Sequence, residues 1–262
     1  MRRAIPFVSS AALFIIACGP PRPAGYFTYE GRRGDSLAAL SARFGGDENL
    51  TKTLSREAGR AADVPFDAGE RVAIPFESLK GHRDVIETFA LVREARERRA
   101  RGDYAAALAA LKAAYAARPD EPAVAFELGA TYYEAGDYAR AAAALARANA
   151  LAPQDEEVIL MLALATAEAG DAAKGATLLR DLAAARPDFR YGLYVLGELD
   201  VRAGNYPAGR HYLFEYLKSN GEGLVAAYAR EAIKASARAE MEAAARALEK
   251  AGAAKEEAEA PR

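Results

Sequence analysis

Residues 122–154 read PAVAFELGATYYEAGDYARAAAALARANALAPQ and carry the clearest fold signal in the chain. Apolar residues recur three and four positions apart on both sides of Gly136, which predicts two helices joined by a tight turn. The small residues Gly129 and Ala141 allow the two helices to approach closely, and larger residues such as Leu145 fill the remaining space. The stretch is therefore expected to be a helical hairpin with one apolar face on each helix.

The same pattern recurs along the chain with a fixed period. The prolines Pro119, Pro153 and Pro187 are each 34 residues apart. The turn glycine recurs in step, at Gly102, Gly136, Gly170 and Gly204. In frame, the copies cover residues 88–121, 122–155, 156–189 and 190–223.

A period of 34 residues with two helices per unit resembles the tetratricopeptide repeat. The copy at 122–155 matches that family's pattern at Leu128, Gly129, Tyr132, Gly136, Tyr138, Ala141, Leu145, Ala148 and Pro153. The resemblance implies a right-handed α-helical solenoid of about four repeats over residues 85–223, stacked because no copy buries its apolar faces alone. A capping helix is expected over residues 224–250 and a disordered tail over 251–262.

Such a solenoid has a concave surface lined by the first helix of each repeat. The residues predicted to line it are Phe89, Val92, Arg96, Arg99, Phe126, Tyr133, Leu160, Leu164, Tyr191, Tyr194 and Glu198. An exposed apolar and aromatic groove is typical of a binding surface for a peptide or helix of a partner protein. The alternative is that the C-terminal helix, or the packing of a short superhelix, covers this surface.

Residues 26–77 carry a different pattern, which predicts a small separate domain. Asp35 or Ser36 is placed to cap a helix that carries Leu37, Leu40 and Phe44 on one face. The expected order is a strand at residues 26–29, that helix, a second helix from Asp47 to about Ala58, and a strand at 71–75. The fold class is therefore mainly α, with a small βααβ domain before the solenoid.

The stretches YEGRRGDSLAALSARFG at 29–45 and DAGERVAIP at 67–75 resemble a LysM domain. Gly31 and Ala68 depart from the usual valine and proline of that family. The resemblance implies binding of peptidoglycan or another N-acetylglucosamine glycan between two loops. The implied glycan-binding residues are Gly34, Asp35, Ser36, Leu37, Asp63, Val64, Pro65 and Phe66. The alternative is a LysM fold that has lost its glycan site.

The N-terminus predicts export and lipid attachment. Arg2 and Arg3 precede an uncharged run at 4–17, which is shorter than the about 20 residues of a membrane-spanning helix and fits a signal peptide over 1–17. Ile15-Ile16-Ala17-Cys18 resembles the lipobox of bacterial lipoproteins, which implies acylation of Cys18, the only cysteine. Residues 18–25 then form a Pro/Gly tether, and Gly19 favours the outer membrane, facing the periplasm. An ordinary secreted protein with a spare cysteine is the alternative.

Other classes find little support in the composition. A formal net charge of -2 gives no reason to expect a nucleic-acid partner. Gly34-Asp-Ser-Leu37 is also the nucleophile motif of a family of serine esterases, but neither His82 nor His211 follows an aspartate at the spacing that those enzymes need for a base. The same two histidines have no ligand-spaced neighbours for a metal. We therefore expect no catalytic site, no metal and no cofactor.

Together these patterns predict a lipid-anchored cell-envelope adaptor. Its LysM domain would bind peptidoglycan, and its repeats would bind an envelope protein that the sequence does not identify. Its acyl chains would anchor it in the membrane. Two alternatives remain open at this stage. One is an assembly lipoprotein of a secretion or pilus machine with a vestigial LysM domain, and the other is an accessory factor that delivers a cell-wall enzyme.

Overall fold

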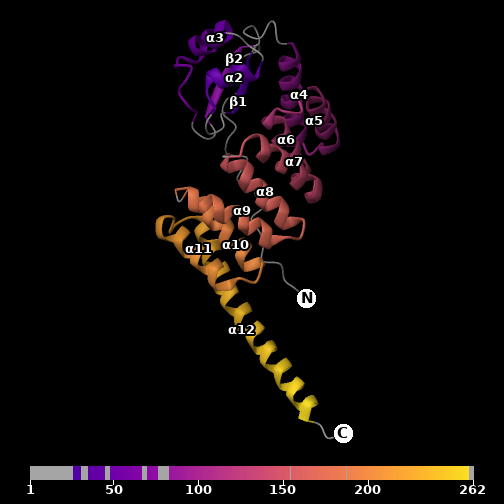
Figure 1. The fold of residues 1–262 in the computed structure, drawn as a ribbon, viewed down its shortest axis with the longest axis vertical. Coiled ribbons are helices and arrows are strands. Elements are labelled where there is room, and N and C mark those ends of the chain that lie inside the picture. The colour runs from indigo at the N-terminus through magenta and orange to yellow at the C-terminus, as the bar shows by residue number, and fades with distance from the viewer. Residues whose placement is uncertain are drawn as a thin grey trace. The chain divides into compact units, whose positions relative to one another are not determined.

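The computed structural model describes residues 26–30, 35–44, 48–66, 70–75, 83–153, 155–186 and 188–259 (Figure 1). These residues belong to two compact units, one ending at Ala165 and the other beginning at Thr166. The predicted signal peptide and tether at residues 1–25, with Cys18, lie outside the described residues, as do Gly34 and His82.

The first unit opens with a two-stranded antiparallel sheet. Strand β1 (Tyr26–Glu30) pairs with β2 (Arg71–Pro75), in a register that sets Tyr29 opposite Val72. Between them come helix α2 (Leu37–Arg43) and helix α3 (Glu48–Ala58). The order of strand, helix, helix and strand is the order that the sequence predicts, because the apolar residues of each element face one small core.

That core is not closed by residues 26–77 alone. Leu37, Leu40 and Phe44 of α2 are buried, as predicted, and they share one cluster with Val85 and Phe89. The last two residues belong to α4 (Arg83–Ala100), the first helix of the first repeat, which begins five residues before the predicted start at 88. Because α4 packs on the βααβ segment, the predicted separation of the two domains is not seen in the packing of this unit.

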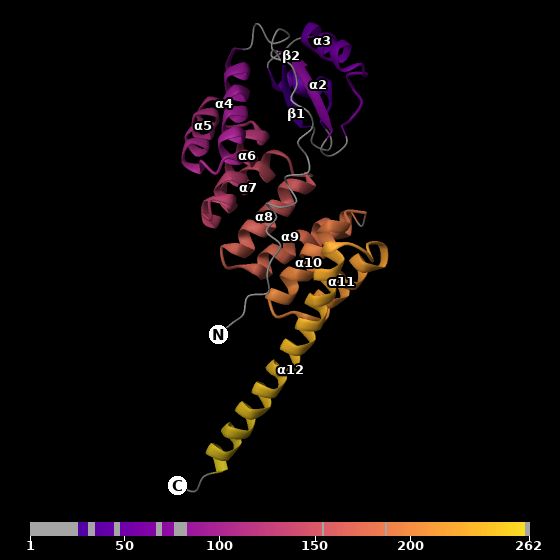
Figure 2. The same ribbon diagram turned by 180° about the vertical axis from the view of Figure 1, so that it is seen from behind.

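The repeats are helical hairpins, two helices to a copy. The remaining helices are α5 (Tyr104–Ala117), α6 (Pro122–Glu134), α7 (Tyr138–Leu151), α8 (Glu156–Glu168), α9 (Ala172–Ala185), α10 (Arg190–Arg202) and α11 (Tyr206–Ser219). Helices α4 and α5, α6 and α7, and α10 and α11 lie side by side as pairs (Figures 1 and 2). This arrangement agrees with the period of 34 residues.

The turn inside each hairpin has the same construction. Gly136 has a φ of +80°, a left-handed conformation that favours glycine, and the equivalent glycines of the other three copies also have positive φ. Asp137 follows as the N-cap of α7, and its side chain accepts a hydrogen bond from the Arg140 amide at 3.1 Å. Asp103 and Asp171 cap α5 and α9 in the same way.

A small residue on the first helix and a leucine on the second recur at the same two positions of all four copies. The small residues are Ala95, Gly129, Ala163 and Gly197, and the leucines are Leu111, Leu145, Leu179 and Leu213. All four leucines have at most 1% of their surface exposed. A Cβ added at Gly129 would lie 2.5 Å from Leu145 Cγ, and one added at Gly197 would lie 2.6 Å from Leu213 Cγ. The absence of a side chain at these positions therefore sets how closely the helices approach.

The C-terminal helix corrects a prediction. Helix α12 extends over Leu224–Glu259, whereas the sequence predicted a helix to about residue 250 and then a disordered tail. Ala226, Ala229 and Ala232 are buried, which agrees with the predicted capping of the last repeat. Beyond residue 240 the side chains up to 251 are all exposed, and the helix leads away from α10 and α11 (Figure 2). The high helix propensity of Ala, Glu and Lys accounts for the extra turns.

The recurring contact is tested by a double-mutant cycle at Gly129 and Leu145. Gly129→Ala is expected to lower the free energy of unfolding by about 1–3 kcal/mol through overpacking, and Leu145→Ala by about 2–5 kcal/mol through a cavity. In the double variant the added methyl group enters the space left by the leucine, so the total loss is expected to be smaller than the sum. Urea unfolding measures each value, and strictly additive losses would contradict this account.

Candidate functional site

The two loops that the LysM resemblance selects lie next to each other. The Phe66 amide donates to the Asp35 carbonyl oxygen at 2.7 Å, and the Ala38 amide donates to the Ala62 carbonyl oxygen at 2.9 Å. These backbone hydrogen bonds join the residues before and at the start of α2 to the segment that follows α3. The structure therefore brings together the described members of the predicted glycan site, and Gly34 lies outside the described residues.

The side chains of these loops divide into two groups. Leu37 and Phe66 are buried in the core, with 0% and 2% of their surface exposed, so they support the loops and do not face a ligand. Asp63, Val64 and Pro65 are exposed, and Val64 is a large apolar residue with 43% of its surface open. The accessible part of the candidate site is therefore the segment at 63–65.

Arg60 holds that segment in place, a role that the sequence gave no signal for. Its guanidinium donates to the Val64 carbonyl oxygen at 3.2 Å and to the Pro65 carbonyl oxygen at 2.9 Å. The same group lies over the Phe66 ring, 4.8 Å from its centroid, and pairs with Glu70. A single half-buried cation thus fixes the backbone that presents Val64.

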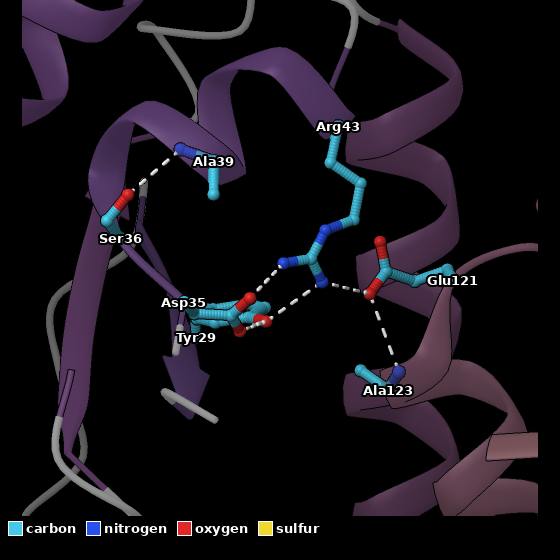
Figure 3. A network of polar contacts seen from close by, with 7 residues as sticks. All are labelled: Tyr29, Asp35, Ser36, Ala39, Arg43, Glu121 and Ala123. Atoms are coloured by element: carbon cyan, nitrogen blue, oxygen red, sulfur yellow. Dashed lines mark hydrogen bonds and ion pairs between the residues drawn. The ribbon is translucent and has the colours of Figure 1, made fainter. Parts of the chain in front are cut away.

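The other loop is organised by a polar network around Asp35 (Figure 3). The Tyr29 hydroxyl donates to one carboxylate oxygen of Asp35, and Arg43 donates to the other. Arg43 also donates to the Tyr29 hydroxyl oxygen at 3.1 Å and to Glu121 Oε1 at 3.2 Å. Ser36 caps α2 by accepting from the Ala39 amide at 3.1 Å. The Asp35 carboxylate is therefore bound by Tyr29 and Arg43, and its predicted contact with a glycan stays a prediction.

The charges of this network are mutually stabilised. Burial raises the pKa of the Tyr29 phenol, and Asp35 and Glu121 raise it further while Arg43 opposes them, so Tyr29 acts as a neutral donor. Burial by itself would lower the pKa of Arg43, but Tyr29, Glu121 and Asp35 outweigh that effect and raise it. Arg43 therefore stays charged in its partly buried position.

The predicted groove residues of the repeats are less accessible than expected. Six of the eleven are buried, with at most 9% of their surface exposed: Phe89, Val92, Phe126, Leu160, Leu164 and Tyr194. Glu198 is buried as well, at 6%. Arg96, Arg99, Tyr133 and Tyr191 keep intermediate exposure. The prediction that all eleven residues line an open groove is therefore wrong for the seven buried ones. Phe89, for example, belongs to the first core.

The two arginines of the predicted groove are engaged with acidic residues of the next repeat. Arg96 and Arg99 on α4 both pair with Glu127 on α6, at 2.5 Å and 2.8 Å, and Arg99 also approaches Glu134 at 3.4 Å. Burial would raise the pKa of Glu127, but the two guanidinium groups lower it below its ordinary value. These arginines therefore join neighbouring repeats through a buried carboxylate.

Glu198 lies close to Tyr194, one of three clustered tyrosines in the second unit. The Tyr191 and Tyr194 rings lie 5.9 Å apart, and Tyr194 lies 5.6 Å from Tyr216 on α11. Burial raises the pKa of Glu198 to about 7, against a weaker opposing effect of Arg202, which itself pairs with Glu168 at 2.7 Å. Glu198 is thus an acid whose charged form is disfavoured by its surroundings.

Comparison with known proteins identifies the repeats. Residues 98–165 match the tetratricopeptide repeat family, and no curated protein matches the chain. The chain contains tetratricopeptide repeats, a scaffold consistent with protein–protein interaction. The match spans part of α4, the whole of α5 to α7 and most of α8, which includes the stretch from Pro122 to Pro153.

Solved structures support the same fold. A tetratricopeptide repeat protein from Parabacteroides merdae is 20% identical with a TM-score of 0.51, and the match covers 57% of this chain and 60% of that one. This chain therefore spans less than two thirds of that relative. A MamA protein is 19% identical with a TM-score of 0.50, covering 67% of this chain and 97% of the other. MamA from Desulfovibrio magneticus is 16% identical with a TM-score of 0.50, covering 58% and 90%. These likenesses concern the fold alone.

Two further observations hold for the described residues only. Within the ranges listed above, no helix is both long enough and apolar enough to cross a membrane. In the same ranges, no group of three or more His, Cys, Asp or Glu side chains is arranged to hold a metal ion.

The raised pKa of Glu198 gives a pH prediction. Because the folded state favours the neutral acid, the stability that Glu198 contributes is complete below pH 4.5 and is lost as the pH rises to about 7. Glu198→Gln keeps a neutral group, so at pH 8 the variant is expected to exceed the parent by on the order of 2–3 kcal/mol, with little difference at pH 4. Thermal unfolding across this range measures the difference. The exposed change Glu222→Gln is the control, and a constant offset for Glu198→Gln would contradict the account.

Proposed function

We propose that this protein is a lipid-anchored adaptor of the bacterial cell envelope. Acyl chains on Cys18 anchor the protein in a membrane, which is the outer membrane on its periplasmic side. The segment at 26–77 binds an N-acetylglucosamine glycan such as peptidoglycan, and the tetratricopeptide repeats bind a second protein. The observation that carries the proposal is the pairing of the two loops, with Val64 exposed on one of them, in a chain that also contains repeats.

The chemistry of the exposed loop suits an acetylated sugar. An N-acetyl group needs hydrogen bonds for its amide and an apolar contact for its methyl group. Val64 offers 43% of its surface for the methyl contact, and the neighbouring backbone is fixed by Arg60. A preformed loop loses little conformational entropy on binding, which favours a small ligand.

The repeats supply the protein-binding arm. Tyr133 and Tyr191 are the aromatic residues of the predicted groove that keep intermediate exposure, and tyrosine is a frequent anchor in protein interfaces. Each contact by itself is modest. Anchoring raises the effective concentration at the other sites, so membrane, glycan and protein contacts reinforce one another.

A second candidate function is favoured by one observation. Asp35 is hydrogen-bonded within the polar network, and Leu37 and Phe66 are buried in the core. Only a short exposed segment is then left to contact a glycan. The βααβ segment would then be a structural part of an assembly lipoprotein, and the repeats alone would bind its partners. Glycan binding separates the two candidates.

The glycan arm is tested by sedimentation with purified peptidoglycan sacculi. The chain from residue 18 with Cys18→Ser is expected to co-sediment, and Val64→Asp is expected to weaken retention about tenfold or more through loss of the methyl contact. The full repeat region is kept because Val85 and Phe89 complete the first core. Asn49→Asp, which adds the same charge on α3, is the control. If the parent chain does not sediment, the glycan arm fails and the second candidate replaces it.

The anchor is tested in bacterial cells fed an alkynyl palmitate. The chain is expected to acquire the label and to sediment with membranes, because two or three acyl chains hold a protein firmly on a bilayer. Cys18→Ser is expected to abolish both, whereas Ser10→Ala in the preceding segment is expected to preserve them. An unlabelled parent chain found in the culture fluid or the cytosol would refute the lipoprotein assignment.

A further inference from the structure

The contact between the βααβ segment and the first repeat is built from aromatic rings. Phe89 of α4 lies 5.6 Å from Phe44 and 6.4 Å from Tyr29, both in edge-to-face arrangements. Val85, one turn earlier on α4, belongs to the same buried cluster. The first core is therefore completed by α4, the helix that also forms the first hairpin with α5. The βααβ segment and the first repeat thus share this helix.

Two arginines cross this contact in opposite directions. Arg43, at the end of α2, reaches Glu121 at 3.2 Å, the N-cap of α6 in the second repeat. Arg118, the C-cap of α5, donates to the Arg43 carbonyl oxygen at 2.6 Å and pairs with Asp84 on α4 at 2.7 Å. The bonds connect α2 to residues that are more than 70 positions away in the chain.

Loss of the ion pair between Arg43 and Glu121 would leave a buried carboxylate without its cation. The Glu121 side chain has no exposed surface, and its second carboxylate oxygen is buried without a hydrogen-bond partner. A buried carboxylate that loses its cation is strongly disfavoured. Arg43 simultaneously neutralises Asp35 at the start of the glycan loop. One guanidinium therefore links the candidate glycan loop to the repeats.

We infer that the described residues between 26 and 75 and helices α4 to α7 form one rigid body and that Arg43 is its positioning residue. In most proteins two domains in one chain move relative to each other unless their contact is large and well packed. Here the shared aromatic core and the crossed arginines remove that freedom. If the proposed function holds, a partner bound near α4 to α7 would be kept at a fixed distance from the glycan.

The inference is tested by the distance between two spin labels in the N-terminal unit. Cys18→Ser removes the only cysteine, and Lys52→Cys on α3 with Ala113→Cys on α5 then gives two exposed labelling sites. Pulsed electron resonance is expected to give one narrow distance distribution. Arg43→Met is expected to broaden it about twofold or more, because the two parts regain the independent motion that is usual for domains.

Matched variants separate positioning from folding. Arg56→Met removes an arginine of the same segment whose side chain is 76% exposed, against 20% for Arg43, and is expected to leave the distribution narrow. Glu121→Gln removes the other partner of the ion pair and is expected to broaden it as Arg43→Met does. A second label pair within the repeats, Ala113→Cys with Ala146→Cys, is expected to stay narrow in every variant.

Three results would overturn the inference. The first is a broad distribution in the parent chain, and the second is an Arg43→Met distribution as narrow as that of the parent. The third is broadening of both label pairs, which would mean that Arg43 supports the fold of the repeats and does not specifically position the two parts. None of these measurements needs a ligand, so the inference stands or falls independently of glycan binding.

Discussion

The paired helices of these repeats are constrained by the contact between a glycine on the first helix and a leucine on the second, as at Gly129 and Leu145 and at Gly197 and Leu213. At Gly129 the approach is so close that even a methyl group would meet Leu145. A small residue and a leucine occupy the same two positions in all four copies, and each of the four leucines is buried. Close-packed interiors tolerate little change in volume. The constraint therefore fixes the separation of the paired helices, and with it the surface that each hairpin offers to its neighbours.

Charge plays a different part from packing in this chain. Glu127 and Glu121 are both buried carboxylates, and each is compensated by arginines of an earlier element: Arg96 and Arg99 for Glu127, and Arg43 for Glu121. Buried ion pairs contribute less to stability than to the choice of one arrangement, because an unpaired partner is costly while a paired one gains little. The carboxylates thus specify which elements meet, and the apolar contacts supply the driving force. Because these arginines and carboxylates bind one another, we do not expect them to bind a ligand. The candidate binding surfaces are then Val64 with its neighbours and the half-exposed tyrosines.

Much of the fold follows from patterns that are local in the sequence. The positive φ of Gly136 and the cap by Asp137 are properties of a few consecutive residues, so their recurrence every 34 positions predicts each hairpin. The helix from Leu37 and the strand at Arg71–Pro75 are predicted equally well, because alternation and helical spacing reflect one buried face. Composition predicts disorder beyond residue 250, but helix α12 continues to Glu259 because Ala, Glu and Lys have a high helix propensity. The LysM assignment and the lipid anchor stay predictions.

Local patterns in the sequence are enough to predict the period, the turns and the small-to-large alternation inside each hairpin, and the LysM resemblance implied that the loops at 35–37 and 63–66 lie together. The surroundings of each side chain follow only from the folded chain. Asp35 and Ser36 are neighbours with similar hydrogen-bonding groups, yet one is held by Tyr29 and Arg43 and the other caps α2. Likewise, the sequence does not predict that Glu121, Arg118 and Phe89 connect the βααβ segment to the repeats. Their partners are distant along the chain, and periodicity describes which face of an element is buried but carries no information about the element that covers it.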